Sequence, residues 1–460
     1  MNIDEWKIKH QDRRYYTHFD PKYSLSEVWN YISDSKKVSE HSFYPFIHYQ
    51  LKFKKYSKKK GVKIKERDIS YAAHKDRFIF QYYAYKLNQI YNSRLVHEGI
   101  NENVIGYRDN LHKNNVHFAK DAIDFIKENK QSYILIGDFT GFFDNLDHKY
   151  LKTMLKNLLQ VHDLPNDYYA VFKNVTRYST WELSSLIALN KLEGNKKGIR
   201  EFNKLQKALS SDVFKEQKKY CLDKNKKGFG IPQGSPISSI FSNIYMLEFD
   251  IQMKKLIVDA EAGFYMRYSD DFILILPHKQ LEEFKEIYQK ILSIINSKPR
   301  LVLESDKTQI FRFENKKIQS ANEDILEGVE NGLDSMNYLG FNFDGEQVRI
   351  KDKTISKYFY KMHRKLKTIT KNGGYVRRKK ADGQYEYIKS SNKNLYRDFS
   401  IKGSVVSDDN KGNFITYVKR VDKIFVNEPA IKKILNTHMQ KIKKKLNKTP
   451  LRRLKRWKAR

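Results

Sequence analysis

Cysteine is almost missing from this 460-residue chain, since Cys221 is the only one. A single cysteine excludes a disulfide framework and a structural zinc site built on cysteines. The first residues lack the charged-then-apolar pattern of a secretory signal, and no apolar run approaches the length of a membrane span. Internal repeats and long low-complexity linkers are missing too. We therefore expect a cytoplasmic protein of about two to four domains with no membrane partner.

Acidic residues are scarce relative to basic ones: 54 Asp and Glu stand against 88 Lys and Arg, for a formal net charge of +34. The excess lies mainly at one end. The last 110 residues hold 33 basic and 8 acidic side chains, which leaves only +9 for the first 350. Such a charge indicates a polyanionic partner. Aromatic residues make up 14% of the chain and, beside so much Lys and Arg, offer stacking surfaces for bases as well as core packing.

Two apolar segments lead into acidic residues. Tyr133–Ile136 predicts a buried strand, and Asp138 follows it after one glycine. The segments 264–267 and 272–276 predict a hairpin with two adjacent acids in its turn, Asp270 and Asp271. If both elements belong to one sheet, the three carboxylates share an edge. Taken alone, each half is also explained by a helix cap or a turn.

Carboxylates gathered in this way suit nucleotidyl transfer. That reaction needs a 3′-hydroxyl nucleophile, a pyrophosphate leaving group and neutralisation of the charge between them, which two Mg²⁺ ions about 4 Å apart provide. Mg²⁺ prefers carboxylate oxygens, so two or three Asp must converge on one point. Mn²⁺ accepts the same ligands and is an alternative ion. Asp138, Asp270 and Asp271 are the candidates for catalysis and for metal binding.

A glycine- and proline-rich stretch, Gly228–Ser239, precedes the second acidic segment. Its glycines and prolines predict a tight loop whose backbone is open to a ligand, although a purely structural loop is the alternative. Ser235 and Pro236 predict the N-cap and first residue of a helix. Apolar residues at helical spacing continue that helix: Ile237, Ile240, Ile244 and Leu247.

Read in order, six segments resemble the motifs of reverse transcriptases, and the likeness covers about residues 65–345. They are a fingers segment at Tyr71–Phe78, palm motifs at Asp138–His148, Gly230–Ser239, Tyr268–Asp271 and Leu303–Thr308, and a primer-grip turn at Tyr338–Phe341. Ser269 stands in the third palm motif where Ala, Met or Val is commoner. The resemblance implies a mixed α/β right-hand polymerase whose antiparallel palm sheet carries the catalytic Asp residues.

The same resemblance implies a division of the chain. Residues 1–130 would form the fingers with an N-terminal extension, and residues 131–345 the palm, with a helical fingers-side segment at about 150–227. Residues 346–460 would form a helical thumb with a basic C-terminal extension. After Lys351, an apolar stripe at helical spacing predicts a docking helix: Ile355, Phe359, Met362, Leu366 and Ile369.

Roles of individual residues also follow from the resemblance. The Phe139 carbonyl would assist the three Asp in binding metal. Phe143 would lie under the sugar and favour deoxynucleotides, with core packing as the alternative. The other implied nucleotide contacts are Lys75, Arg77, Gln233, Gly234 and Lys307. A solvated helix start is the alternative for Lys75 and Arg77, and a plain surface lysine for Lys307.

Contacts with primer and duplex complete the expected site. The primer grip would consist of Tyr338, Leu339 and Gly340. Basic side chains near the C-terminus would hold nucleic-acid phosphates, with a solvated helix face as the alternative. They are Lys357, Lys361, Arg364, Lys365, Arg377, Arg378, Arg452 and Arg453.

The implied activity is RNA-directed DNA synthesis, with an RNA template, dNTPs and a DNA product. No endonuclease, ribonuclease H or integrase motif accompanies it. The segment Asn413–Arg420, after Leu395–Ser400, looks most like the tails of bacterial stand-alone, defence-associated reverse transcriptases, which would imply a dedicated non-coding RNA and a role against phage. Two other functions stay open: template-independent or protein-primed synthesis, and a catalytically inert RNA-binding scaffold. A partner protein or homo-oligomer is also compatible with the sequence.

Overall fold

The structure is a computed structural model that describes residues 1–12, 14–57, 61–108, 110–371, 375–380, 383–389, 393–403 and 412–447. The chain divides into two compact units. Unit 1 comprises residues 1–112, 135–276 and 280–308, and unit 2 comprises residues 113–134, 277–279 and 309–460. The division into fingers, palm and thumb by sequence range stays a prediction.

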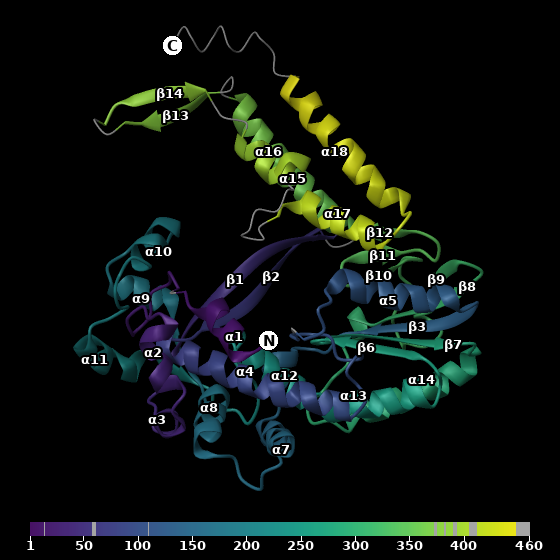
Figure 1. Cartoon of the computed structure of the whole chain (residues 1–460), viewed down its shortest axis with the longest axis horizontal. Helices are drawn as coiled ribbons and strands as arrows, with labels where there is room; N and C mark the ends of the chain where they lie inside the picture. The colour runs from purple at the N-terminus through teal and green to yellow at the C-terminus, as the bar shows by residue number, and fades with distance from the viewer. Residues whose placement is uncertain are drawn as a thin grey trace. The chain divides into compact units, whose positions relative to one another are not determined.

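Unit 1 holds a long β-hairpin and most of the helices (Figure 1). Its helices are α1 (Ile3–His10), α2 (Leu25–Ile32), α3 (Ser35–Ser39), α4 (His74–His97), α6 (Phe142–Asn145), α7 (His148–Leu159), α8 (Asn166–Thr176), α9 (Leu183–Leu189), α10 (Lys196–Phe202), α11 (Ser211–Cys221), α12 (Ser238–Tyr245), α13 (Leu247–Met253) and α14 (Leu281–Asn296). A π-helical turn (Lys254–Asp259) follows α13, and a 3₁₀ turn covers Ser305–Lys307.

The strands of unit 1 fall into two groups. The hairpin strands β1 (Phe46–Ser57) and β2 (Gly61–Tyr71) belong to a four-stranded sheet with β4 (Ser179–Glu182) and β5 (Leu222–Lys224), in the order β2-β1-β4-β5. Residues 51–57 and 61–65 lie in the two strands of this hairpin. The strands β6 (Phe264–Tyr268) and β7 (Asp271–Pro277) pair antiparallel, as predicted.

Strand β3 (Gln131–Gly137) crosses the boundary between the units, which falls between Ile134 and Leu135. It is the middle strand of a five-stranded sheet with the order β6-β7-β3-β8-β9. Every residue of β3 after Gln131 is buried, as the apolar run from Tyr133 to Ile136 predicted. A mixed α/β fold with antiparallel pairs is thereby confirmed.

Unit 2 contains the remaining strands and helices, which include two long basic helices. They are α5 (Asn115–Glu128), β8 (Gln309–Glu314), β9 (Lys317–Ser320), β10 (Met336–Tyr338), β11 (Phe341–Phe343), β12 (Val348–Ile350), α15 (Asp352–Lys371), β13 (Tyr375–Lys379), β14 (Tyr385–Lys389), α16 (Lys393–Phe399), a 3₁₀ turn (Ile401–Gly403), α17 (Phe414–Ile424) and α18 (Pro429–Asn447). The stripe predicted for α15 buries Met362 and Leu366 against Leu395 and Ile442, so this helix docks as expected.

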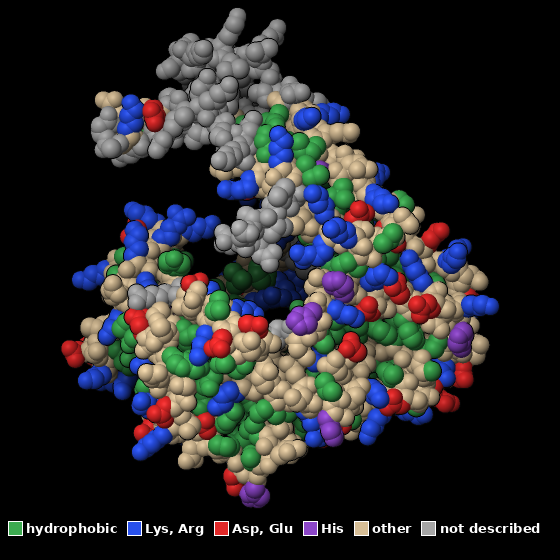
Figure 2. All heavy atoms as spheres, in the orientation of Figure 1, with side chains coloured by type: hydrophobic (Ala, Val, Ile, Leu, Met, Phe, Trp, Pro, Cys, Tyr) green, Lys and Arg blue, Asp and Glu red, His purple; other side chains and the backbone are tan. Residues whose placement is uncertain are grey.

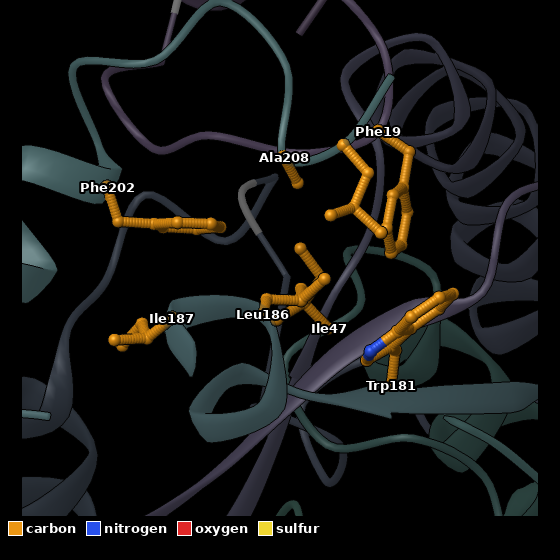
Figure 3. Packing of buried hydrophobic residues seen from close by; sticks show 8 residues of the cluster. Phe19, Ile47, Trp181, Leu186, Ile187, Phe202 and Ala208 are labelled. Carbon is orange, nitrogen blue, oxygen red and sulfur yellow. The ribbon is translucent and has the colours of Figure 1, made fainter. Parts of the chain in front are cut away.

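An aromatic and aliphatic core fixes the base of the β1–β2 hairpin in unit 1 (Figure 3). Trp181 of β4 is fully buried and packs its ring 5.3 Å from that of Phe19. Ile47 of β1 and Leu186 of α9 join the same cluster. Each buried Ile, Leu or Phe side chain of this cluster stabilises the fold by about 1.5–3 kcal/mol. The cluster therefore anchors the first residues of β1.

One helix start differs from the sequence prediction. The helix α12 begins at Ser238 with Ile237 at the N-cap position, two residues later than the Ser235–Pro236 start that was expected. The Ser238 hydroxyl donates to the Pro232 carbonyl at 2.7 Å, which ties the helix end to the preceding loop. The four residues of the predicted stripe are all buried, but they do not belong to one helix, because α12 ends at Tyr245 and Leu247 begins α13.

Candidate active site

Asp138 follows β3 directly and is held by the segment that runs beside it. Its backbone carbonyl accepts from the Glu304 N–H at 2.8 Å, and the Thr140 N–H donates to the Val302 carbonyl at 2.9 Å. The Asp138 Oδ2 atom accepts from Lys307 Nζ at 2.5 Å. The other oxygen, Oδ1, is buried and has no hydrogen-bond partner among the described residues. The Oδ1 atom is therefore available to bind a cation.

Asp270 and Asp271 lie at the tip of the β6–β7 hairpin. In its register, Tyr268 pairs with Asp271, which leaves a two-residue turn of Ser269 and Asp270. Ser269 has a φ of 61°, in the left-handed region. The Arg267 guanidinium donates to the Ser269 carbonyl at 2.7 Å and is itself paired with Asp250 at 2.6 Å, with both side chains fully buried. A buried ion pair thus fixes the turn that carries both acids.

The structure brings Asp138 and Asp270 into one electrostatic neighbourhood. Burial raises the pKa of Asp270, and the charge of Asp138 raises it further. Burial lowers the pKa of Lys307, but Asp138, Glu304 and Asp270 outweigh this effect, so its pKa is raised overall. One ammonium therefore responds to both acids, as expected for a charge placed between them.

The carboxylate oxygens of Asp138 and Asp270 suit a divalent cation. Among the described residues, no group of three His, Cys, Asp or Glu lies close enough to hold a metal as it stands. The unpartnered, buried Oδ1 of Asp138 and the neighbouring Asp270 nevertheless supply the carboxylate oxygens that Mg²⁺ prefers. Asp271 is exposed beside them. Phe139 has a buried ring that stacks on Phe272 at 5.4 Å; the metal role of its carbonyl stays a prediction.

Phe143, Gln233 and Gly234 come together. The Ile231 N–H donates to the Phe143 carbonyl at 2.9 Å, and Gln233 Nε2 donates to Asp144 Oδ2 at 3.3 Å. The Gln233 carbonyl accepts from the Ser70 N–H at 2.8 Å. Gly234 has a φ of 107°, and a Cβ there would lie 2.8 Å from the Ser70 carbonyl oxygen. The loop therefore needs glycine at this position, where the end of β2 meets it.

Lys75 and Arg77 are turned toward aromatic and buried surroundings. The Lys75 ammonium lies 4.6 Å from the centroid of the Tyr31 ring and 5.2 Å from that of Tyr23. Arg77 is only 6% exposed, and its Nη1 donates to Gln81 Oε1 at 3.1 Å. Burial lowers the pKa of Arg77. Their role as triphosphate ligands stays a prediction.

The β1–β2 hairpin offers cations that the sequence reading did not single out. Lys63, Lys65 and Arg67 alternate along β2, so their side chains share one face of the strand. This part of β2 is exposed, and the strand continues to Ser70 at the Gln233 loop. Alternation of basic residues at every second position was the available signal. These three side chains are therefore further candidates for nucleotide phosphate contacts.

The predicted primer grip is a tight turn in unit 2. Tyr338 ends β10, and Leu339 and Gly340 follow with φ of 43° and 95°, as in the two-residue turns of β-hairpins. The Leu339 carbonyl accepts from Asn115 Nδ2 at 3.0 Å. The structure thus confirms a turn at this position, and its contact with a primer stays a prediction.

Basic side chains follow the solvent side of α15. Lys357, Lys361 and Arg364 are exposed and Lys365 is half-buried. Figure 2 shows Lys and Arg side chains spread over the part of the chain that contains α15 and α18. The backbone of Arg377 and Arg378 belongs to β13, whereas their side chains, and Arg452 and Arg453 entirely, lie outside the described residues.

The family is shown by comparison with known proteins. Residues 57–343, more than half of the chain, match the family model described as reverse transcriptase (RNA-dependent DNA polymerase). The chain therefore belongs to the reverse transcriptase family. No curated protein matches it in sequence. Among the helices that the structure describes, none is long and apolar enough to cross a membrane.

Solved telomerase structures are among the similar folds. Apo telomerase from Candida tropicalis truncated from its C-terminal domain aligns with a TM-score of 0.41 and 14% identity, over 72% of this chain and 61% of that chain. Telomerase from Candida tropicalis in complex with the TWJ fragment of telomeric RNA aligns with a TM-score of 0.38 and 16% identity, over 92% of this chain and 59% of that chain. The chain thus spans about 60% of their length.

Proposed function

We propose that the protein is an RNA-directed DNA polymerase that uses two-metal-ion nucleotidyl transfer. One observation carries the proposal: Asp138, directly after β3, accepts from Lys307 at 2.5 Å, and Asp270, in the β6–β7 turn, lies close enough for its charge to act on the same ammonium. Two partly buried carboxylates that share a single lysine cost stability, so their presence here favours a catalytic use.

Asp138, Asp270 and Asp271 would hold two Mg²⁺ ions, with Mn²⁺ as a substitute. When bound, such ions activate the attacking hydroxyl and neutralise the leaving pyrophosphate. The chain's own groups supply the rest. Lys307 is placed to move from Asp138 toward the leaving phosphates, since its side chain is 49% exposed. Phe143 and Gln233 would position the sugar and base of the incoming nucleotide beside them.

Primer extension tests the proposal. The purified protein is given a primed RNA template, labelled dNTPs and Mg²⁺, and the same assay is run with Asp270→Ala. We expect template-length DNA from the wild type and a loss of at least about a thousandfold in the variant. Asp163→Ala, which removes an exposed carboxylate of the same unit, serves as the matched control and should retain activity.

Three other outcomes would contradict the proposal. A product of random or homopolymeric sequence made without template, or one joined to the protein, would assign untemplated or protein-primed synthesis. Full activity of Asp270→Ala would contradict catalysis at this site. A biological effect that survives Asp138→Asn but not removal of the C-terminal charge would assign an RNA-binding scaffold.

The finer assignments stay predictions of the sequence resemblance. We propose a dedicated non-coding RNA as template and a role in antiphage defence, supported by the tail segment 413–420 and the basic surface of α15. Sequencing of RNA that copurifies with the protein tests the first. A single enriched RNA species would support it, whereas a sample of the total cellular RNA would contradict it.

A further inference from the structure

A second basic site lies in unit 1 between α7, α8 and the segment 225–228. It is a cavity of about 630 Å³, and six cationic side chains line it: Lys149, Lys152, Lys173, Arg177, Lys226 and Lys227. The only acidic residue in its wall is Asp147, whose carboxylate accepts from the Tyr150 N–H at 2.9 Å as the cap of α7. We call this cavity the α7–α8 groove.

The six cations of the α7–α8 groove outnumber the single carboxylate in its wall. In the part of the chain that the structure describes, none of the six forms an ion pair with Asp or Glu, whereas many other lysines of unit 1 do. Cations gathered around a cavity repel one another and attract a polyanion. Spaced phosphates of one nucleic-acid strand would neutralise several of them together.

An aromatic side chain points to an unpaired strand. Tyr169 of α8 is 38% exposed in the wall of the groove, and Lys152 Nζ lies 5.1 Å from its ring centroid. Exposed rings beside cations bind single strands, because an unstacked base lies on the ring while the cation meets the phosphate. A duplex keeps its bases stacked inside and would leave Tyr169 without such a partner.

The groove continues toward the nucleotide loop. A neighbouring cavity of about 470 Å³ shares Asn225, Lys226 and Lys227 with it and extends to Gly230 and Gln233. Carboxylates also line this second cavity, so phosphates would contact it on the side of Lys226 and Lys227; they are Asp68, Asp144, Glu182 and Asp223. The shared segment is fixed to the region after Asp138, since the His148 N–H donates to the Gly228 carbonyl at 2.9 Å. A strand that passes Gln233 therefore meets Lys226 and Lys227 and then the groove.

We propose that the α7–α8 groove binds the unpaired 5′ part of the RNA template, ahead of the position being copied. The identity of the strand rests on the proposed function, whereas the binding of single-stranded RNA does not. The groove would hold the template by its phosphates and so keep the next base at Gln233.

Binding of two RNA–DNA primer–template substrates tests the groove, one with a short 5′ template overhang and one with an unpaired overhang of about 16 nucleotides. The triple variant Lys149→Gln, Lys152→Gln, Lys173→Gln is compared with a matched control, Lys215→Gln, Lys218→Gln, Lys219→Gln, which removes the same charge from exposed positions of α11. Affinity is measured by fluorescence anisotropy over a range of salt concentrations. We expect the groove variant to bind the long-overhang substrate about tenfold or more weakly, with a salt slope smaller by about 2. Its affinity for the short-overhang substrate should match the wild type.

Equal losses for both substrates, or equal losses in the α11 control, would overturn the proposal. So would an unchanged salt slope, or the same loss when the overhang is made double-stranded. Tyr169→Leu should lower the affinity for the long-overhang substrate with little change in the salt slope. This variant therefore tests base stacking separately from phosphate contacts. Because binding needs no catalysis, repeating it in Asp270→Ala separates a failure of the groove from a failure of the polymerase proposal.

Discussion

Phe143 is the residue that the resemblance to reverse transcriptases assigns to selecting the sugar of the incoming nucleotide. It sits in α6, five positions after Asp138, and its carbonyl accepts from Ile231 of the Gln233 loop. The ring is half-buried, and its centroid lies 5.5 Å from that of Phe142. A ring under the sugar would clash with a 2′-hydroxyl.

Phe143→Ala should therefore admit ribonucleotides. We expect the preference for dNTP over the matching rNTP to fall about tenfold or more, since one lost steric contact changes selectivity by that order. Single-nucleotide incorporation with each substrate measures the ratio. Phe143→Tyr keeps the ring and should keep the preference. A preference unchanged in Phe143→Ala would show that the ring only packs the core.

The proximity of Asp138 and Asp270 lowers the stability of the folded protein. Burial and Asp138 raise its pKa above that of the unfolded chain, so its ionised form is disfavoured in the folded protein. The resulting loss of stability appears as the pH rises above about 4, where the unfolded chain ionises, and persists at neutral pH.

Asp270→Asn should abolish polymerase activity while raising the melting temperature at pH 7 by up to a few degrees. Thermal unfolding without added divalent ions measures the second effect. Asp163→Asn, at an exposed site, should leave both properties unchanged. A lower melting temperature for Asp270→Asn would contradict the inference that the ionised Asp270 carboxylate destabilises the folded protein.

At the scale of elements, the β6–β7 hairpin depends on α13, the α-helix that precedes it in the chain. Asp250 of α13 receives Arg267 Nε at 2.7 Å and Nη2 at 2.6 Å, and it also accepts from the Tyr265 hydroxyl at 2.7 Å. The remaining Arg267 nitrogen reaches the Ser269 carbonyl. The guanidinium therefore joins α13 to the turn that holds Asp270, a proposed catalytic acid.

Arg267→Met should destabilise the protein by about 3–5 kcal/mol, because it leaves Asp250 buried without its partner. Adding Asp250→Asn should restore part of that stability. It should not restore activity, since the Ser269 carbonyl still lacks its donor. Urea unfolding and primer extension on both variants check this. Recovery of activity together with stability would show that the pair serves folding alone.

How far the sequence predicted these elements depends on whether their signals were local. The β3 run, the β6–β7 hairpin and the stripe of α15 follow from periodicity within one segment, and all are confirmed. The Arg267–Asp250 pair joins residues 17 positions apart, and Asp250 reads as an ordinary helix acid until α13 is seen to be buried. The start of α12 moved because Ser238 bonds back to Pro232.

In the candidate site, too, features with a local sequence signal could be predicted, and contacts between distant segments could not. Asp138 and Asp270 could be predicted to meet because strand ends in one sheet share an edge, and their electrostatic coupling agrees with this. The inward setting of Lys75 could not be predicted, because the tyrosines that hold it, Tyr23 and Tyr31, lie in another part of the sequence. The groove cations come from α7, α8 and the segment 225–228, so only folding gathers them.

At the scale of the whole molecule, the two concentrations of positive charge have different origins. The C-terminal 110 residues carry most of the net charge, and α15 displays part of it along one exposed face. Unit 1 is nearer to neutral in sequence, yet it gathers six cations around the α7–α8 groove. Sequence composition alone thus locates the first concentration but not the second. Both suit phosphate contacts that do not depend on base identity.

Two buried histidines, His18 and His74, make the stability of unit 1 sensitive to acid. They lie where the N-terminal residues of the unit meet the start of α4. Burial lowers the pKa of His18 to about 3, and a hydrogen bond to the Tyr71 carbonyl offsets only part of this. Burial and then Arg77 lower the pKa of His74 to about 4. Both rings are fully buried, so the folded protein keeps them neutral at pH values where the unfolded chain protonates them.

The sign of the resulting pH dependence is fixed by these shifts. Below about pH 6.5 the unfolded chain binds protons that the folded chain does not, so the free energy of unfolding falls as the pH falls toward 4. The loss reaches about 1.4 kcal/mol per pH unit for each histidine. Urea unfolding between pH 7 and about pH 4.5 measures it, and His18→Gln, which retains a donor for the Tyr71 carbonyl, should reduce the slope by about one proton. His162→Gln, at a side chain that is 97% exposed, should leave the slope unchanged. A slope that is the same in His18→Gln as in the wild type would mean that the buried ring is not what makes this fold sensitive to acid.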